Sequence, residues 1–109
     1  LPLLALVMIV SANPDPAPCP GATTPEVNAC LAARFSEADA DLNRYYEVAV
    51  QRARKEGVAK GFIQAQRSWL SFRNSECSAI FEKFGDGTIR TSMEIGCRIR
   101  LTRLRTYMI

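Results

Sequence analysis

Histidine is absent from this chain of 109 residues. It is the usual general base in catalysis, the side chain that titrates near neutral pH, and the commonest metal ligand. Without it, the four cysteines have no neighbouring imidazole that could activate a thiolate nucleophile. This absence argues against histidine-dependent hydrolysis, cysteine catalysis and the most frequent kinds of metal site.

Other signatures of catalysis are missing as well. The chain has no glycine-rich phosphate-binding loop, and residues 85–87 are typical of a plain turn. The acidic residues Glu37, Asp39 and Asp41 follow at steps of two, so successive members do not share one face of a helix, and a glycosidase acid pair is not indicated. Their spacing is not that of a calcium loop either. We therefore expect a non-catalytic protein without a metal or a cofactor.

Long apolar runs are scarce. Residues 1–10 form an apolar run that is too short for a bilayer core of roughly 30 Å, which needs about 20 helical residues. Ser11 and Ala12 then offer the small side chains that signal peptidase prefers before its cut. We expect residues 1–12 to be a signal peptide remnant and residues 13–23, rich in proline, to be a linker. A short buried N-terminal helix or strand is the alternative interpretation.

Four cysteines are present, which is an even number. Together with an export signal, this count predicts that all four are paired in an oxidising compartment. We therefore expect a secreted or periplasmic protein. Pro18, directly before Cys19, disfavours the cleavage that would attach a lipid anchor to that cysteine.

Apolar residues recur at steps of three and four along most of the remaining chain, which predicts amphipathic helices. The first helix is expected to have Thr24 as its N-cap and Pro25 in its first turn, and to stop before Gly57. Its inward face would carry a stripe of eight residues: Val27, Leu31, Phe35, Ala38, Leu42, Tyr46, Ala49 and Ala53.

A second helix is predicted from about Val58 to Phe84. Gly61 weakens its first turn by roughly 1 kcal/mol relative to alanine, so a start at Gly61 or Phe62 is the alternative. The inward stripe of this helix mixes apolar, polar and charged residues: Phe62, Gln66, Trp69, Arg73, Cys77, Ile80 and Phe84.

A third helix is predicted to begin at Thr88, or at a capping box formed by Thr91 and Glu94. One face would present Ile89, Met93, Cys97, Leu101, Leu104 and Met108. No strand signal competes with the three helical patterns. Because two short turns join the helices, the sequence predicts an all-α, up-down-up three-helix domain over residues 24–109.

The hairpin register predicts the disulfides. In the second hairpin, facing residues have numbers that add up to about 173, and Cys77 and Cys97 fit this rule. Cys30 is seven residues out of register with Cys77, which is about 10 Å along a helix axis. We therefore expect Cys77 to pair with Cys97, and Cys19 to pair with Cys30.

Arg73 is expected to hold two helices together. It shares a buried stripe with Trp69, and an uncompensated buried charge costs several kcal/mol. The first hairpin places Asp39, Asp41 and Asn43 opposite Arg73, and we favour Asp39 because it belongs to the inward side of the first helix. An anion-binding role for Arg73 is the less favoured interpretation.

Trp69 is expected to fill the space between the two hairpins. Gln66, on the same stripe, is expected to be a buried structural amide. We predict that it bonds to a backbone group or to Tyr45 or Tyr46. Neither residue is expected to bind a ligand.

Charge is distributed unevenly along the chain. Residues 1–50 carry two basic and six acidic residues, a net of −4, whereas residues 51–109 carry twelve and five, a net of +7. The basic third helix could bind phosphates or an anionic membrane surface. We favour the alternative that it stabilises a helix C-terminus and pairs with the acidic first helix. The basic residues concerned are Arg98, Arg100, Arg103 and Arg105 of the third helix. Export argues against nucleic acid as a partner.

Four segments of the chain form a recognisable pattern. Their residues are Glu26, Val27, Asn28 and Cys30; Ala38, Asp39, Leu42, Asn43 and Tyr46; Gln66, Arg67, Trp69, Arg73 and Cys77; and Gly87, Ile89, Cys97, Leu101, Thr102 and Arg105. In this order the segments resemble the LprI-like family, whose shared region is named after a mycobacterial lysozyme inhibitor. The resemblance extends from Cys19 to about Met108.

This resemblance implies an exported, cysteine-bridged helical protein that inhibits lysozyme. We expect Glu37, Asp41 and Glu47, on the outward side of the first helix, to form the surface that meets the enzyme. The alternative hypothesis is a cell-envelope interaction module that binds anionic lipid or polymer through the basic third helix. The sequence indicates no oligomeric state.

Overall fold

A computed structural model describes residues 19–109, which form three helices and no strand. The helices are α1 (Thr24–Lys55), α2 (Ala59–Lys83) and α3 (Arg90–Met108). The predicted all-α class is therefore confirmed. The expected signal peptide remnant, residues 1–12, lies outside the described residues, as does the expected linker up to residue 18.

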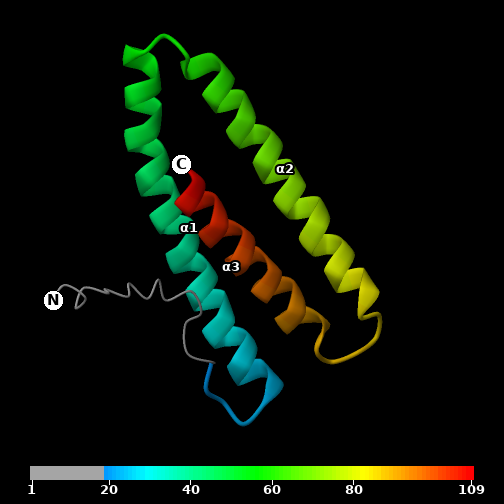
Figure 1. The fold of residues 1–109 in the computed structure, drawn as a ribbon. Coiled ribbons are helices and arrows are strands. Elements are labelled where there is room, and N and C mark those ends of the chain that lie inside the picture. Colours follow the sequence, from blue (N-terminus) through cyan, green and yellow to red (C-terminus); the bar gives the residue numbers. More distant parts are fainter. Residues whose placement is uncertain (1–18) are drawn as a thin grey trace, which may run out of the picture.

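The helices are arranged as an open V with a third helix inside it (Figure 1). α1 and α2 meet near the turn at Gly57, where the rings of Tyr46 and Phe62 stack with their centroids 5.3 Å apart. Toward their other ends they diverge, and α3 runs back between them, parallel to α1 and antiparallel to α2 (Figure 1). The up-down-up order is thus as predicted, with α3 as the shared partner of both other helices.

The first helix begins one residue earlier than predicted. Thr23, rather than Thr24, is the N-cap: its hydroxyl accepts a hydrogen bond from the Glu26 amide at 3.3 Å. The Glu26 carboxylate in turn accepts from the Thr23 amide at 3.0 Å, which completes a capping box. The helix ends as expected, because Gly57 has φ +76°, a left-handed conformation that favours glycine.

The start of α2 agrees with the prediction, whereas that of α3 differs from it. α2 begins at Ala59, directly after the predicted Val58, so Gly61 lies inside the helix and does not delay it. α3 begins at Arg90, and Thr91 and Glu94 form no capping box. Instead, the Arg90 guanidinium donates to the Gly85 carbonyl oxygen at 2.9 Å and so closes the preceding turn.

Both predicted disulfides are present. Cys19 is bonded to Cys30, with 5.8 Å between the Cα atoms, and Cys77 to Cys97, with 5.6 Å. The first fastens the segment before α1 onto its second turn, and the second joins α2 to α3 in the buried interior. The hairpin register from which we derived them is therefore correct.

The core is small, and polar side chains take part in it. Its buried apolar residues are Ala38, Leu42, Val50, Ala53, Cys77, Cys97 and Ile99. Gln66, Arg73 and Thr102 are buried beside them. Since a small core leaves limited hydrophobic stabilisation, the disulfides and the buried polar contacts carry part of the task of fixing the helices.

The predicted inward stripe of α3 is wrong at both ends. Ile89, Leu104 and Met108 are 50%, 57% and 66% exposed, whereas Ile99 and Thr102 are buried. At the C-terminal end, the cause is that α3 lies between two helices. Because it contacts both of them, a different and wider set of its side chains faces inward than in a hairpin of two helices. No helix within residues 19–109 is both long enough and apolar enough to cross a membrane.

Candidate functional site

Arg73 of α2 touches both other helices through one guanidinium group. Its Nη1 atom donates to Asp39 Oδ1 of α1 at 3.1 Å and to Thr102 Oγ1 of α3 at 3.2 Å. Arg73 is only 8% exposed, so these bonds compensate a charge that has lost most of its water. Of the three acceptors we considered, the structure places Asp39 on Arg73, as we favoured.

Two aromatic rings cover the same guanidinium. Its carbon lies 5.2 Å from the ring centroid of Phe35 on α1, and 5.2 Å from that of Trp69 on α2. Cation–π contacts of this kind attract the charge to the ring faces. The Nε atom of Arg73 is buried and has no hydrogen-bond partner within residues 19–109. Because protein groups surround the guanidinium, this geometry favours an internal clamp over an anion-binding site.

Gln66 also connects α2 to α3. Its side-chain oxygen accepts a hydrogen bond from Arg105 Nε at 2.9 Å, and the residue is buried. We had predicted a backbone group or one of the tyrosines Tyr45 and Tyr46 as the partner. The position of α3 inside the V brings Arg105 to Gln66 instead, and this contact orients the last turns of α3 on α2.

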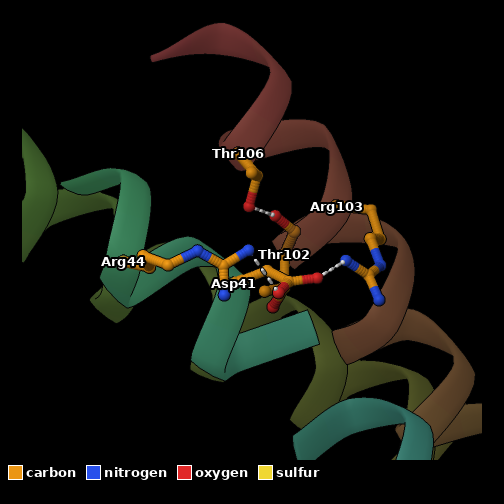
Figure 2. A network of polar contacts seen from close by, with 5 residues as sticks. All are labelled: Asp41, Arg44, Thr102, Arg103 and Thr106. Carbon is orange, nitrogen blue, oxygen red and sulfur yellow. Dashed lines mark hydrogen bonds and ion pairs between the residues drawn. The ribbon is translucent and has the colours of Figure 1, made fainter. Parts of the chain in front are cut away.

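Asp41 bridges α1 and α3 at the surface. Figure 2 shows Arg44 and Arg103 approaching its carboxylate from the two helices, with nitrogen–oxygen distances of 3.0 Å and 2.6 Å. The hydrogen bond from Arg103 is the main reason why the pKa of Asp41 lies below its ordinary value. One turn further, the Thr106 hydroxyl donates to the Thr102 carbonyl oxygen (Figure 2). The Asp41 carboxylate is therefore paired with two arginines of the same chain, although it lies at the surface.

Glu37 and Glu47, the other two acidic residues of the expected docking surface, are exposed on α1. Neither forms a hydrogen bond or an ion pair with another described residue. Ten residues separate them, which is about 15 Å along the helix axis. Arg44 lies between them and also covers the ring of Tyr45, with 5.4 Å from its guanidinium carbon to the ring centroid. The outward side of α1 thus presents two carboxylates, Glu37 and Glu47, that are unpaired within residues 19–109. Between them lies Asp41, whose charge is offset by Arg44 and Arg103.

The four arginines of the basic third helix are mostly bound within the domain. Arg98 donates to Glu94 at 3.0 Å and to Asn74 at 2.9 Å. Arg103 bonds to Asp41, and Arg105 to Gln66, as described above. Among the four, Arg100 alone is exposed without a partner in the described part of the chain. This arrangement agrees better with internal pairing than with a continuous basic surface on α3.

An open groove of about 320 Å³ lies where the segment before α1 approaches the start of α3. Its lining consists of Gly21, Ala22, Thr23, Thr24, Val27, Thr88, Ile89 and Ser92. None of these side chains ionises. Near the groove, the Ser92 hydroxyl donates to the Asn28 amide oxygen and joins α3 to α1. Residues 19–109 contain no group of three or more acidic, cysteine or histidine side chains that could hold a metal ion.

Sequence reasoning missed two residues that complete the clamp. Thr102 is fully buried, and Phe35 lies beneath the guanidinium of Arg73. Phe35 was on the predicted stripe of the first helix, but nothing in its spacing linked it to a charge. Thr102 lies on a second stripe at steps of four, three and four, with Ile95, Ile99 and Thr106. That stripe was the signal that could have identified it.

A comparison with protein families decides the assignment. The sequence matches the family described as lysozyme inhibitor LprI over residues 17–108. The chain belongs to the LprI family. The matched region includes all three helices and both disulfides, so the clamp around Arg73 and the acidic side of α1 lie within the family domain.

A relative, uncharacterized protein R02472 of Rhizobium meliloti (strain 1021), is 30% identical over 123 residues. The alignment covers 96% of this chain and 88% of the relative. No solved structure matches the chain.

Proposed function

We propose that this LprI-family protein is an exported, non-catalytic binding protein that inhibits lysozyme. The observation that carries the proposal is the family match, which covers nearly the whole described chain and bears the description of a lysozyme inhibitor. The absence of histidine from the sequence agrees with a protein that acts by binding.

Two bonded cysteine pairs support export. Disulfides persist in oxidising compartments such as the periplasm and the extracellular space, and are rare in the cytosol. All four cysteines of the chain are bonded in this way. Lysozyme acts on the cell wall outside the cytosol, so an exported protein would meet it there.

The outward side of α1 is our proposed docking surface. The helix has 32 residues and is about 48 Å long, which is enough to span a typical interface of about 800 Å² per partner. Many lysozymes are strongly basic, and opposite charge on the inhibitor speeds association. Glu37 and Glu47 are available for such contacts because neither is paired within the described residues. We assign Asp41 a supporting role, since its carboxylate is held by Arg103 and Arg44.

The test is a titration of lysozyme with the oxidised chain, read as the rate at which a cell-wall suspension clears. We expect the paired substitution Glu37→Gln and Glu47→Gln to weaken inhibition about tenfold, since each exposed ion pair is worth roughly 0.2–1 kcal/mol. Glu76→Gln with Glu82→Gln is the matched control. It removes the same charge from exposed positions of α2 and should leave potency unchanged. Equal weakening by both pairs would contradict the α1 surface, and full lytic activity at micromolar excess of chain would contradict inhibition.

A further inference from the structure

The turn between α1 and α2 carries a dense group of exposed cations. We call this group the basic apex, and it comprises Arg52, Arg54, Lys55 and Lys60. It lies at the end of the molecule where α1 and α2 come together, opposite the end where α1 begins (Figure 1). Glu56 is the single acidic residue among them, so the apex has four positive charges against one negative charge.

None of the four apex cations has a side-chain partner within residues 19–109. This distinguishes them from four arginines elsewhere in the domain, which donate to side chains of neighbouring helices: Arg73, Arg98, Arg103 and Arg105. Unpaired cations so close together repel one another, and their energy falls when an anionic surface approaches.

Helix stability explains only part of this arrangement. Arg52, Arg54 and Lys55 lie in the last turn of α1, where the helix dipole favours positive charge. Lys60, however, is the second residue of α2, and a helix N-terminus disfavours a cation. The first turn of α2 contains no acidic residue that would offset it. The position of Lys60 therefore needs an explanation outside the helix itself.

An apolar side chain is exposed among the cations. Val58, between the two helices, is 56% exposed. Membrane surfaces attract peripheral proteins through this combination, in which cations contact lipid headgroups and an apolar residue enters the boundary below them.

We propose that the basic apex docks on an anionic lipid surface. The four cations contact lipid phosphates, and Val58 inserts between the headgroups. Glu37 is 18 residues before Lys55, or about 27 Å along α1, so this end of the proposed lysozyme-facing side stays clear of the lipid. The inference does not depend on the proposed inhibition, because it concerns a different surface with a different partner.

The experiment measures cosedimentation of the oxidised chain with vesicles. One vesicle type is pure phosphatidylcholine, and the other contains roughly 30% phosphatidylglycerol in phosphatidylcholine, which gives an anionic surface. The quantity compared is the ratio of the partition coefficients for the two vesicles, in which contributions common to both cancel. We expect a ratio well above one, which falls toward one as salt rises from about 0.05 M to about 0.3 M, since exposed charges are screened.

Variants locate the contact. Lys55→Gln with Lys60→Gln should lower the ratio about 25-fold, because each cation near an anionic surface contributes a factor of about five. The matched control is Lys83→Gln with Arg100→Gln, which removes the same charge from exposed positions away from the apex. It should lower the ratio less than about twofold, since distant charges are screened.

A third variant separates binding from folding. Lys60→Glu places an acid in the first turn of α2, which should raise the melting temperature because the helix dipole favours it. The same variant should lose lipid binding, since two units of charge change at the apex. A ratio of one for the unsubstituted chain would overturn the proposal. So would equal losses in the apex and control pairs, which would show attraction by net charge, or undiminished binding by Lys60→Glu.

Discussion

Removal of the clamp at Arg73 should reveal how much of the domain's stability depends on one buried cation. Arg73→Ala deletes the ion pair to Asp39, the hydrogen bond to Thr102 and the contacts with two rings. Because the residue is only 8% exposed, we expect a loss of about 3–5 kcal/mol in the free energy of unfolding. Arg73→Met keeps the volume of the stem and removes the buried charge, so it should cost less, about 1–2 kcal/mol.

The two acceptors of Arg73 differ in burial, which predicts that substitution of the buried Thr102 costs more stability than substitution of the partly exposed Asp39. The Asp39 side chain is 39% exposed, so water can replace part of its contact and Asp39→Asn should cost only about 1 kcal/mol. Thr102 is fully buried, and Thr102→Val leaves one charged donor unsatisfied at a cost of about 1.5–3 kcal/mol.

Urea denaturation with both disulfides intact measures these free energies, provided that the slope with urea is unchanged between variants. A double-mutant cycle of Arg73→Met with Asp39→Asn should give a coupling of about 0.5–1 kcal/mol. A cost below about 1 kcal/mol for Arg73→Ala, or greater damage from Arg73→Met, would refute the clamp.

Three further predictions concern the cap, the disulfides and acid. Thr23→Ala should lower the free energy of unfolding by about 1 kcal/mol and Thr24→Ala by almost nothing, and urea denaturation of both variants tests which threonine caps α1. Replacing Cys77 and Cys97 with serine should lower the free energy of unfolding by about 3 kcal/mol, because the bond closes a 20-residue loop. Thermal melting measures this loss, and a loss near zero would contradict the prediction. The carboxyl pKa values of Asp41 and Glu26 are lowered in the folded chain, mainly by hydrogen bonds from Arg103 and Thr23. Their stabilisation should be complete above the unfolded pKa of about 4 and decline as pH falls toward the folded values. Asp41→Asn should then be less stable than the unsubstituted chain at neutral pH and approach its stability in acid.

The parts of the fold that were predictable are those governed by short turns. A turn of a few residues fixes which positions of two helices face each other, so Cys77 could be matched to Cys97 and Arg73 to Asp39 from their spacing in the sequence. The α1–α3 pairing lacks such a turn. The contacts from Asp41 to Arg103 and from Asn28 to Ser92 depend on how α3 enters the V, and the sequence offered no register for them.

The sequence-based predictions were wrong where two alternatives were nearly equivalent in their local pattern, as for the N-cap of α1 and the inward face of α3. Thr23 and Thr24 can both cap a helix, and only Thr23 lies three residues before Glu26, which decides between them. On α3, two apolar stripes overlap, and contact from both sides buried Ile99 and Thr102 while leaving Leu104 and Met108 outside. The candidate docking surface was harder still, because an inhibitor that works by covering an enzyme needs no distinctive arrangement of reactive groups. Glu37 and Glu47 could be placed on an outward side, but their partner could be suggested only by the family.

The most direct test of the central claim is the titration of lysozyme with the oxidised chain, beside a sample whose disulfides have been reduced. We predict that the oxidised chain slows cell-wall lysis in proportion to its concentration. The reduced chain should be weaker, because the α2–α3 bond between Cys77 and Cys97 holds the fold that presents α1. Undiminished lysis at micromolar excess of the oxidised, folded chain would contradict it.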